Sequence, residues 1–335
     1  MVRRASKRTR IGLASAPVLW TASVWAPMMS AVLRPSAAGR VVEVDEFGSN
    51  PGGLRMFVYA PPKKLPAGAP LIVVLHGCGQ DAGNFARNCG WIALAQRIGA
   101  ALLLPEQTVK NSSGRCFNWY QPSDIRRGSG EAKSIRQMVR AALLRFKSDP
   151  RRVFVVGLSA GGAMAAALLA AYPNVFAAGA VVAGMPVGAA YNGASALLRM
   201  RRADPFSSRH SLAEAVRRAA PKTVRPRVWP RLSIWQGGRD QLVDARNAEA
   251  LAAQWTELQG FGAIPTSESE PMKGVRHRVW STPRRAAVEF WTIADMGHGF
   301  PVDSSAFGGG RSGFGVINAG LPAARHIARF WGIDS

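Results

Sequence analysis

The chain has 335 residues, 47% of them hydrophobic, and no internal repeat or low-complexity tract is visible, which favours one large α/β core and excludes repeat and disordered classes. Its 43 Lys and Arg against 20 Asp and Glu give a formal net charge of +23. Such an excess suits an anionic partner, but the basic residues are mostly arginines scattered among Ala and Pro, with no recognisable nucleic-acid-binding module. We therefore expect no nucleic-acid partner.

Residues 1–38 resemble a secretory signal peptide or another N-terminal extension. A basic head through Arg10 precedes 23 uncharged residues, 11–33, and the small residues 36–38 could form a cleavage site. Pro17 and Pro27 make the stretch a poor membrane span, so we expect no stable one. We expect a secreted or periplasmic protein whose catalytic domain covers 39–335. The alternative is a cytoplasmic protein with an N-terminal extension.

The next third of the chain predicts one edge and the centre of a sheet. Strand-like stretches at 41–47 and 54–60, joined by a Gly- and Pro-containing turn, predict an antiparallel edge hairpin. Uninterrupted apolar runs at 71–75 and 101–105 predict buried strands. Helical periodicity follows at 90–98 and from about 130 to 147.

The chain is organised around a strand, a turn and a helix near residue 159. A β-branched run at 153–156 leads into Gly157-x-Ser159-x-Gly161 and then into an Ala- and Leu-rich helix that should end near Tyr172. A strand before the motif and a helix after it distinguish a nucleophile elbow from a chance match in a glycine-rich chain. Such a turn exposes the serine at the carboxyl end of the sheet. The helix start also directs N–H groups at the place where an oxyanion would form.

A second donor loop follows the predicted strand at 71–75. In enzymes with a nucleophile elbow, the loop after this earlier strand supplies the other oxyanion donor. We assign the backbone N–H groups of Cys78 and Ala160 to the oxyanion hole, and we expect His76 to be structural.

An excursion of about 185–227 follows the sixth predicted strand, 177–183, and includes a basic helix-like stretch at 211–219. It is either a cap-like insertion that shapes a substrate cleft or a surface decoration.

The remaining members of a catalytic triad follow two later strands. Asp240 lies five residues past the end of a predicted strand at 231–235, on the loop that supplies the acid in this architecture. Asp244 is the alternative candidate for the acid, although it could instead cap the helix that runs to 258. His298 follows the last predicted strand, 287–293, and it alone of the five histidines combines a post-strand loop, flanking glycines and the order Ser, Asp, His.

Five motifs occur in the order seen in poly(3-hydroxybutyrate) depolymerase-like esterases, a family that includes feruloyl and acetylxylan esterases. They are HGCGQ (76–80), PEQ (105–107), CFNW (116–119), GEAKSI (130–135) and GLSAGGAM (157–164). The Gly-x-x-Asp at 237–240 also matches the family, and the likeness spans roughly 54–331. The resemblance implies an α/β-hydrolase fold, with a mostly parallel central sheet flanked by helices, and hydrolysis of carboxylic esters.

The three cysteines fit an exported protein with one disulfide and one free thiol. Cys78 and Cys116 occupy the two positions where the family has cysteines, which makes them the expected pair. Cys89 is additional and could pair instead, and three buried thiols remain an alternative.

These observations predict a serine esterase that needs no metal or organic cofactor, since no metal-ligand spacing is present. With only 37 residues after His298, we expect no separate polymer-binding domain and favour hydroxybutyrate oligomers or amorphous polymer as the ester substrate, with Trp119 and Phe300 as contacts. The alternatives are a feruloyl or acetylxylan esterase and a catalytically silent scaffold that binds anionic surfaces. Oligomeric state is left open.

Overall fold

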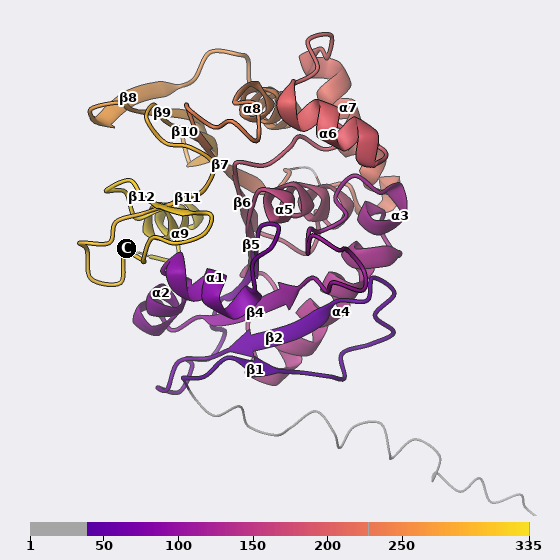
Figure 1. Ribbon diagram of the computed structural model, residues 1–335, viewed down its shortest axis with the longest axis vertical. Helices are drawn as coiled ribbons and strands as arrows, with labels where there is room; N and C mark the ends of the chain where they lie inside the picture. Colours follow the sequence, from indigo (N-terminus) through magenta and orange to yellow (C-terminus); the bar gives the residue numbers. More distant parts are fainter. Residues whose placement is uncertain (1–38, 227, 335) are drawn as a thin grey trace, which may run out of the picture. The chain divides into compact units, whose positions relative to one another are not determined.

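A ten-stranded sheet with strand order β1-β2-β4-β3-β5-β6-β7-β10-β9-β8 dominates the computed structural model (Figure 1). The structure describes residues 39–226 and 228–334, so the predicted signal peptide lies outside the described residues. The neighbouring strands from β4 to β10 pair in parallel, and the strands at both edges pair antiparallel. The predicted edge hairpin is confirmed as the pair β1 and β2.

The strands of this sheet are β1 (Val42–Glu43), β2 (Arg55–Tyr59), β3 (Leu71–Leu75), β4 (Ala101–Glu106), β5 (Val153–Leu158), β6 (Ala178–Val182), β7 (Arg231–Gly237), β8 (Ser267–Met272), β9 (Val275–Thr282) and β10 (Arg285–Ile293). The α-helices are α1 (Ala82–Asn88), α2 (Trp91–Ile98), α3 (Pro122–Ile125), α4 (Gly130–Phe146), α5 (Ala160–Ala171), α6 (Gly193–Arg201), α7 (Arg209–Ala219), α8 (Arg246–Leu258) and α9 (Ala323–Trp331). A short 3₁₀ helix spans Lys222–Val224.

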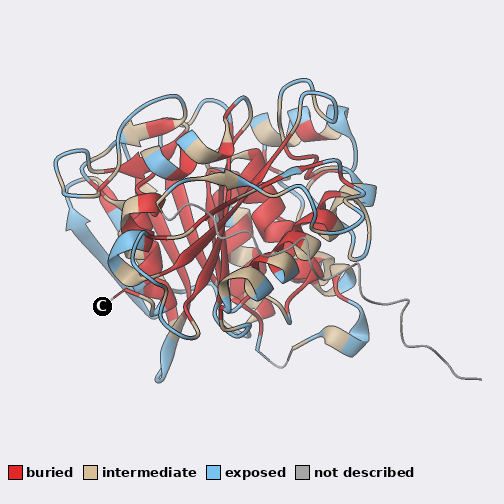
Figure 2. Ribbon diagram, turned by 90° about the horizontal axis from the view of Figure 1, so that it is seen from below, coloured by how far each residue is buried: buried red, intermediate tan, exposed pale blue. Residues whose placement is uncertain are grey.

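The central strands are buried because helices cover both faces of the sheet (Figure 2). Alternate residues of β3 point into different cores: Leu71, Val73 and Leu75 belong to one, and Ile72 and Val74 to the other. Side chains of α4, α5 and α8 complete the first core, whereas those of α1, α2 and α9 complete the second. This double burial explains why the strands read as continuous apolar runs rather than as alternating patterns.

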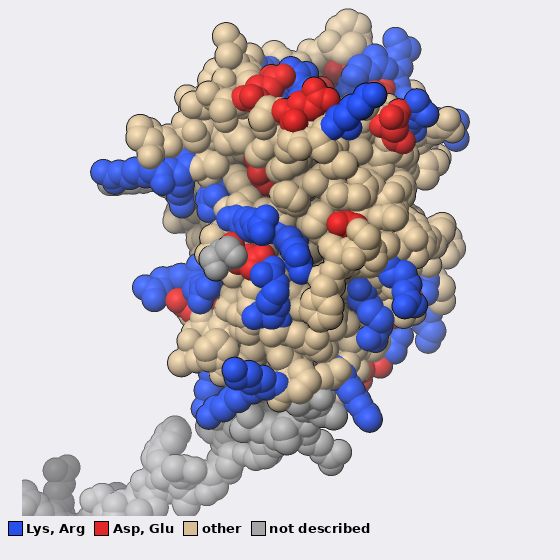
Figure 3. Space-filling view, turned by 90° about the vertical axis from the view of Figure 1, so that its left-hand side faces the viewer, with Lys and Arg blue, Asp and Glu red and all other residues tan. Residues whose placement is uncertain are grey.

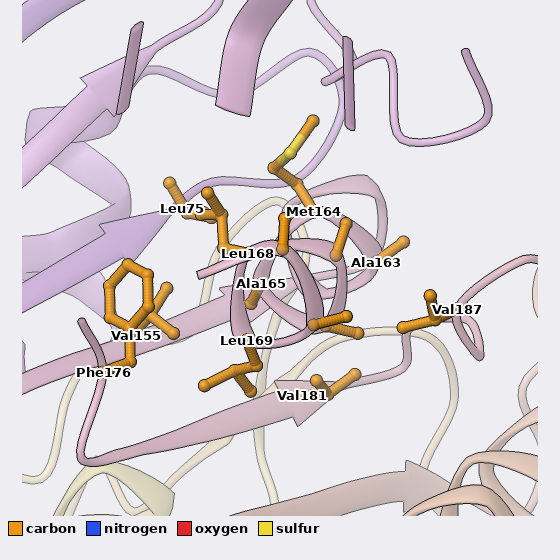
Figure 4. Close-up of a cluster of buried hydrophobic side chains, with 14 of the residues drawn as sticks. Leu75, Val155, Ala163, Met164, Ala165, Leu168, Leu169, Phe176, Val181 and Val187 are labelled. Carbon is orange, nitrogen blue, oxygen red and sulfur yellow. The ribbon is translucent and has the colours of Figure 1, made fainter. Parts of the chain in front are cut away.

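Helix α5 is buried along its whole length (Figure 4). Its Ala- and Gly-rich sequence keeps the helix narrow, so that β5 and β6 approach it closely while Met164, Leu168 and Leu169 fill the space around it. The helix that follows the nucleophile elbow is therefore enclosed by other parts of the fold along its whole length.

Several elements differ from the sequence prediction. The strand β10 is not the last: β11 (Phe300–Val302) and β12 (Val316–Asn318) follow it and form a separate parallel pair. The exposed hairpin of β8 and β9 was not predicted either, because the sequence of β8 has no alternation of apolar residues and its residues are all exposed. Helix α1 was missed because it is only seven residues long.

The excursion after β6 folds into α6 and α7, which pack toward α8 and the acid loop. The backbone N–H of Asp244 donates to Met200 O at 2.8 Å, and that of Val187 donates to Gln254 Oε1 at 2.9 Å. A hollow of about 390 Å³ is lined partly by Tyr191 and Leu198, and none of the three predicted triad residues lines it.

Basic side chains are dispersed over the surface face drawn in Figure 3, with acidic and uncharged side chains between them. Nothing on that face forms the continuous basic stripe that a nucleic-acid footprint would need. Among the described residues, no helix is long and apolar enough to cross a membrane.

Candidate active site

Ser159 lies on a sharp turn between β5 and α5. Its φ of 56° and ψ of −118° fall outside the regions that ordinary residues prefer, and its N–H donates to Val182 O of the neighbouring strand at 2.9 Å. The side chain is partly exposed, although residues on both sides of it are buried. The predicted elbow thus presents its serine at the carboxyl edge of the sheet, on a backbone that the surrounding structure holds in a strained conformation.

The two glycines of the elbow are required by close backbone contacts. A Cβ on Gly157 would lie 2.1 Å from Gly161 O, and a Cβ on Gly161 would lie 2.4 Å from His76 O and 2.5 Å from Leu75 O. All three distances are far below van der Waals contact, so neither position has space for a side chain. The motif GxSxG is therefore a packing requirement of this turn.

Asp240 and His298 form a hydrogen-bonded pair on loops that follow β7 and β10. The Nδ1 of His298 lies 2.8 Å from Asp240 Oδ2, and the same oxygen accepts from Gln236 Nε2 at 3.0 Å. The other carboxylate oxygen accepts from the N–H groups of Leu242 and Val243, both at 2.9 Å. The Asp240 side chain is 0% exposed and that of His298 is 14% exposed.

The bonds to Asp240 favour its ionised form. Burial alone would raise the pKa of this carboxyl, but the hydrogen bonds from His298 and from the backbone of Val243 and Leu242 outweigh burial and lower it. An ionised Asp240 accepts a hydrogen bond from Nδ1–H of His298, so the ring proton stays on Nδ1 and Nε2 is the acceptor nitrogen of the ring. That is the tautomer a general base at Ser159 would need.

The acid loop and the histidine loop approach each other because β7 ends in glycine. A Cβ on Gly237 would lie 2.3 Å from Met296 O and 2.4 Å from Gly297 O, directly before His298. Among the described residues, however, the Ser159 hydroxyl has no hydrogen-bond partner, and His298 bonds through its ring only to Asp240. Catalytic hydrogen bonds are often long in a ligand-free site and shorten when substrate binds.

The two predicted oxyanion donors come from different segments: Cys78 lies on the loop after β3, and Ala160 is the first residue of α5. In the described part of the chain, neither the N–H of Cys78 nor that of Ala160 donates to a protein acceptor, so both are available to a ligand. The structure contains the disulfide Cys78–Cys116, which joins the loop after β3 to the aromatic loop at 116–120. Cys89 is a free, buried thiol whose pKa is raised by burial.

His76 is a structural residue in this arrangement. Its Nδ1 lies 2.7 Å from Gly77 O and its Nε2 accepts from the N–H of Gln107 at 3.1 Å, so the ring is neutral with the proton on Nδ1. Burial lowers the pKa of His76 to about 4, which keeps the ring neutral at physiological pH. The side chain is 0% exposed and ties the end of β3 to the end of β4.

The two predicted substrate contacts are both largely buried in the structure. Phe300 lies in β11, is 0% exposed and packs edge-on against Phe85, so it is a core residue and its placement does not support a substrate contact. Trp119 is 7% exposed and packs edge-on against Tyr120, which leaves it a small accessible surface.

Two exposed apolar side chains that the sequence analysis missed lie beside the site. Phe314 is 76% exposed, its ring lies 3.4 Å from where a Cβ of Gly79 would be, and its carbonyl accepts from Gln80 Nε2 at 2.6 Å. Leu242 is 56% exposed and its N–H donates to Asp240. Phe314 belongs to a glycine-rich loop without periodicity, so only the structure could place it next to the donor loop.

Asp244, the alternative acid, has different partners. Its carboxylate pairs with Arg246 and accepts from the N–H of that residue at 3.0 Å, just before α8 begins. It therefore organises the start of the helix and has no bond to His298. No group of three or more His, Cys, Asp or Glu side chains among the described residues could hold a metal ion.

The comparisons with known proteins identify the family. The family model described as esterase PHB depolymerase matches residues 54–271. A poly(3-hydroxyalkanoate) depolymerase C from Paucimonas lemoignei is 37% identical over 313 residues, which cover 92% of this chain and 73% of that protein. The chain belongs to this esterase family. The resemblance drawn from the five sequence motifs is thus confirmed.

Other relatives of the chain are named as esterases with different substrates. An acetylxylan esterase from Coprinopsis cinerea is 33% identical over 276 residues (79% of this chain, 70% of that protein), and a feruloyl esterase B from Talaromyces funiculosus is 28% identical over 279 residues (80% and 75%). The solved structure of an acetyl xylan esterase from Aspergillus awamori matches with a TM-score of 0.74 at 20% identity, covering 88% of this chain and 99% of that chain. The fold is the α/β-hydrolase fold, and the protein is a carboxylic ester hydrolase.

Proposed function

We propose that this esterase hydrolyses poly(3-hydroxybutyrate) or short hydroxyalkanoate oligomers through an acyl-enzyme on Ser159. The observation that carries the proposal is the Asp240–His298 hydrogen bond of 2.8 Å at the same sheet edge as the strained Ser159 turn. A serine on an elbow and a histidine oriented by a buried carboxylate are the parts that nucleophilic acyl transfer needs.

In this mechanism, Ser159 Oγ attacks the ester carbonyl while Nε2 of His298 removes the hydroxyl proton. Asp240 holds the proton on Nδ1 and stabilises the imidazolium that forms. The N–H groups of Cys78 and Ala160 bind the oxyanion of the tetrahedral intermediate. The imidazolium then protonates the leaving alcohol, and a water activated by His298 hydrolyses the acyl-enzyme and releases the acid and free Ser159.

The choice of a hydroxyalkanoate substrate has two supports. The relative named a poly(3-hydroxyalkanoate) depolymerase is 37% identical over 92% of this chain, more than the acetylxylan and feruloyl esterases reported above. Phe314 and Leu242 also add exposed apolar surface beside the donor loop and the acid loop, which suits a polyester with methyl side groups. In this proposal the insertion at about 185–227 forms one wall of the substrate cleft, because α6 is bonded to the acid loop.

We propose a secreted or periplasmic location. The Cys78–Cys116 disulfide supports it, since such bonds persist in oxidising compartments and are rare in the cytosol.

The test is acid release from hydroxybutyrate trimer, amorphous poly(3-hydroxybutyrate), methyl ferulate and acetylated xylan, each with the wild type and with Ser159→Ala. We expect turnover of the two hydroxybutyrate substrates and its loss in Ser159→Ala. Turnover confined to ferulate or acetyl esters would instead assign the enzyme to plant cell-wall esters. A folded wild-type protein that hydrolyses none of the four would overturn the substrate proposal.

A further inference from the structure

A fully buried carboxyl group, Glu131, is hydrogen-bonded to the segment that follows β4 and has no place in the mechanism above. It is 0% exposed, at the start of α4. Its Oε1 accepts from Gln107 Nε2 at 2.6 Å and from Asn111 Nδ2 at 3.1 Å, and its Oε2 accepts from the N–H of Asn118 at 2.9 Å. An acidic group is rarely buried unless such bonds satisfy it, so its partners are informative.

The surrounding chain is shaped to keep this carboxyl group in place. A Cβ on Gly52 would lie 2.5 Å from Glu131 Cα, and a Cβ on Gly130 would lie 2.4 Å from Asp124 Cα. The N–H of Gly52 donates to Ser134 Oγ at 2.8 Å, one helical turn further along α4. The motif GEAKSI at 130–135 therefore combines two close backbone approaches with the buried carboxyl group.

Two routes lead from Glu131 to the loop of Cys78. In the first, Gln107 bonds to Glu131 through its side chain and to His76 Nε2 through its N–H, and His76 in turn bonds to Gly77 O. In the second, Glu131 holds the N–H of Asn118, and Gln107 Nε2 also donates to Cys116 O at 3.0 Å, next to the disulfide. The first route ends on the peptide group that carries the Cys78 N–H, and the second ends at Cys116, the disulfide partner of Cys78.

We propose that Glu131 is a positioning residue that fixes the Cys78 N–H for the developing oxyanion, through Gln107 and through the disulfide-linked aromatic loop. The inference rests on the proposed function, because it assumes that the Cys78 N–H serves as a donor. A donor acts on the transition state only if it is held at the place the oxyanion will occupy, and a displacement of about 1 Å in such a group lowers the rate roughly 100-fold.

The substitution Glu131→Gln separates positioning from packing. It keeps the size of the side chain but replaces one acceptor oxygen by an NH₂ group, and all three partners of Glu131 are donors. Burial raises the pKa of Glu131 to about 8, and even the protonated acid retains oxygens that accept from Asn118 or Gln107, whereas the amide nitrogen does not. One bond of the network is therefore lost.

We expect Glu131→Gln to lower kcat for a chromogenic butyrate ester roughly 10- to 100-fold with KM within about 3-fold. The affinity for a boronic acid that forms a tetrahedral adduct on Ser159 should fall by a similar factor. The matched control is Ile135→Ala on the same helix, a fully buried apolar residue whose substitution lowers the melting temperature but should leave kcat within about 3-fold. If Glu131→Gln does not fold, Gln107→Met tests the same link and should show the same loss of kcat.

Two outcomes would overturn the inference: an unchanged kcat and boronate affinity in folded Glu131→Gln or Gln107→Met, or an equal loss of kcat in Ile135→Ala. Ser159→Ala, measured alongside, keeps this failure distinct from failure of the proposed function. If Ser159→Ala retains wild-type turnover, the nucleophile assignment falls. If Ser159→Ala is inactive while Glu131→Gln retains wild-type kcat, only the positioning role is lost.

Discussion

Replacing Asp240 by Asn tests the proposed orientation of His298 most severely. In the structure, one carboxylate oxygen faces His298 Nδ1 and Gln236 Nε2, and the other faces the N–H groups of Leu242 and Val243. Whichever way the Asn amide is turned, its NH₂ group meets donors at one of the two positions. The backbone N–H groups cannot change, so the amide oxygen stays with them and the NH₂ group faces His298.

His298 can then satisfy that NH₂ group only by accepting a hydrogen bond at Nδ1, which moves the ring proton to Nε2. A protonated Nε2 cannot remove the proton from Ser159, so we expect kcat to fall by about 10⁴, equivalent to about 5 kcal/mol, with little change in KM. The loss concerns the tautomer rather than packing, because Asn has nearly the size of Asp.

The assay is hydrolysis of a chromogenic short-chain ester by the wild type, Asp240→Asn and Asp244→Asn. The last variant is the matched control: Asp244 belongs to the same segment but bonds to Arg246, so we expect its kcat within about 3-fold of the wild type. A fall of less than 10-fold in folded Asp240→Asn, or an equal fall in Asp244→Asn, would refute the assigned role.

The same substitution has a consequence for acid stability. The hydrogen bonds to Asp240 hold the pKa of its carboxyl below its ordinary value of 3.8, so the ionised group stabilises the fold above that pH, and this stabilisation is lost as the pH falls below about 4. Chemical unfolding of the wild type should show this loss between neutral pH and pH 3. The free energy of unfolding of Asp240→Asn should depend less on pH over that range.

Three further predictions concern the elbow, the disulfide and the apolar rim. Gly161→Ala should lower the free energy of unfolding by about 3 kcal/mol and abolish activity, because its Cβ would lie 2.4 Å from a backbone oxygen. The control is Gly193→Ala, where a Cβ would have no atom within 4 Å. Its free energy of unfolding, measured by thermal unfolding, should stay within about 0.5 kcal/mol of the wild type. Breaking the disulfide by Cys116→Ser should destabilise the fold by about 4 kcal/mol for its sequence separation of 38, and added reductant should lower the melting temperature of the wild type but not of the variant. Phe314→Ala should raise KM for hydroxybutyrate trimer several-fold at an unchanged melting temperature. The control is Phe307→Ala, because Phe307 is 93% exposed and faces α2, and this variant should change neither KM nor the melting temperature. An equal rise in KM in the two variants would contradict the role of Phe314.

The parts of the fold that the sequence predicted well are those whose burial is one-sided or complete. Strands β3 and β5 read as uninterrupted apolar runs because helices cover both faces, and the elbow combines local sequence with backbone strain at Ser159. By contrast, β8 holds no buried residue and forms only through pairing with β9, with ion pairs such as Glu268–Arg276 across the hairpin. Such a strand leaves no periodic pattern to detect.

The candidate site also contains residues that the sequence predicted and residues that it did not. Ser159, Asp240 and His298 follow strand ends in a fixed order, so motif and spacing were enough to nominate them, and the structure joins the last two by a hydrogen bond. Phe300 was expected as an aromatic substrate contact, but tertiary packing places it in β11 against Phe85. The role of Glu131 depends on partners 13 to 24 residues away, which only the structure reveals.

The most direct test of the central claim is to locate the nucleophile. The wild-type protein is treated with a fluorophosphonate, which phosphonylates activated serines, and the adduct is mapped by peptide mass spectrometry while ester hydrolysis is followed in parallel. The account predicts one adduct per chain, on Ser159, that forms as activity is lost, and none in Ser159→Ala. An adduct on another serine that forms as activity is lost, or full hydrolytic activity in Ser159→Ala, would contradict it.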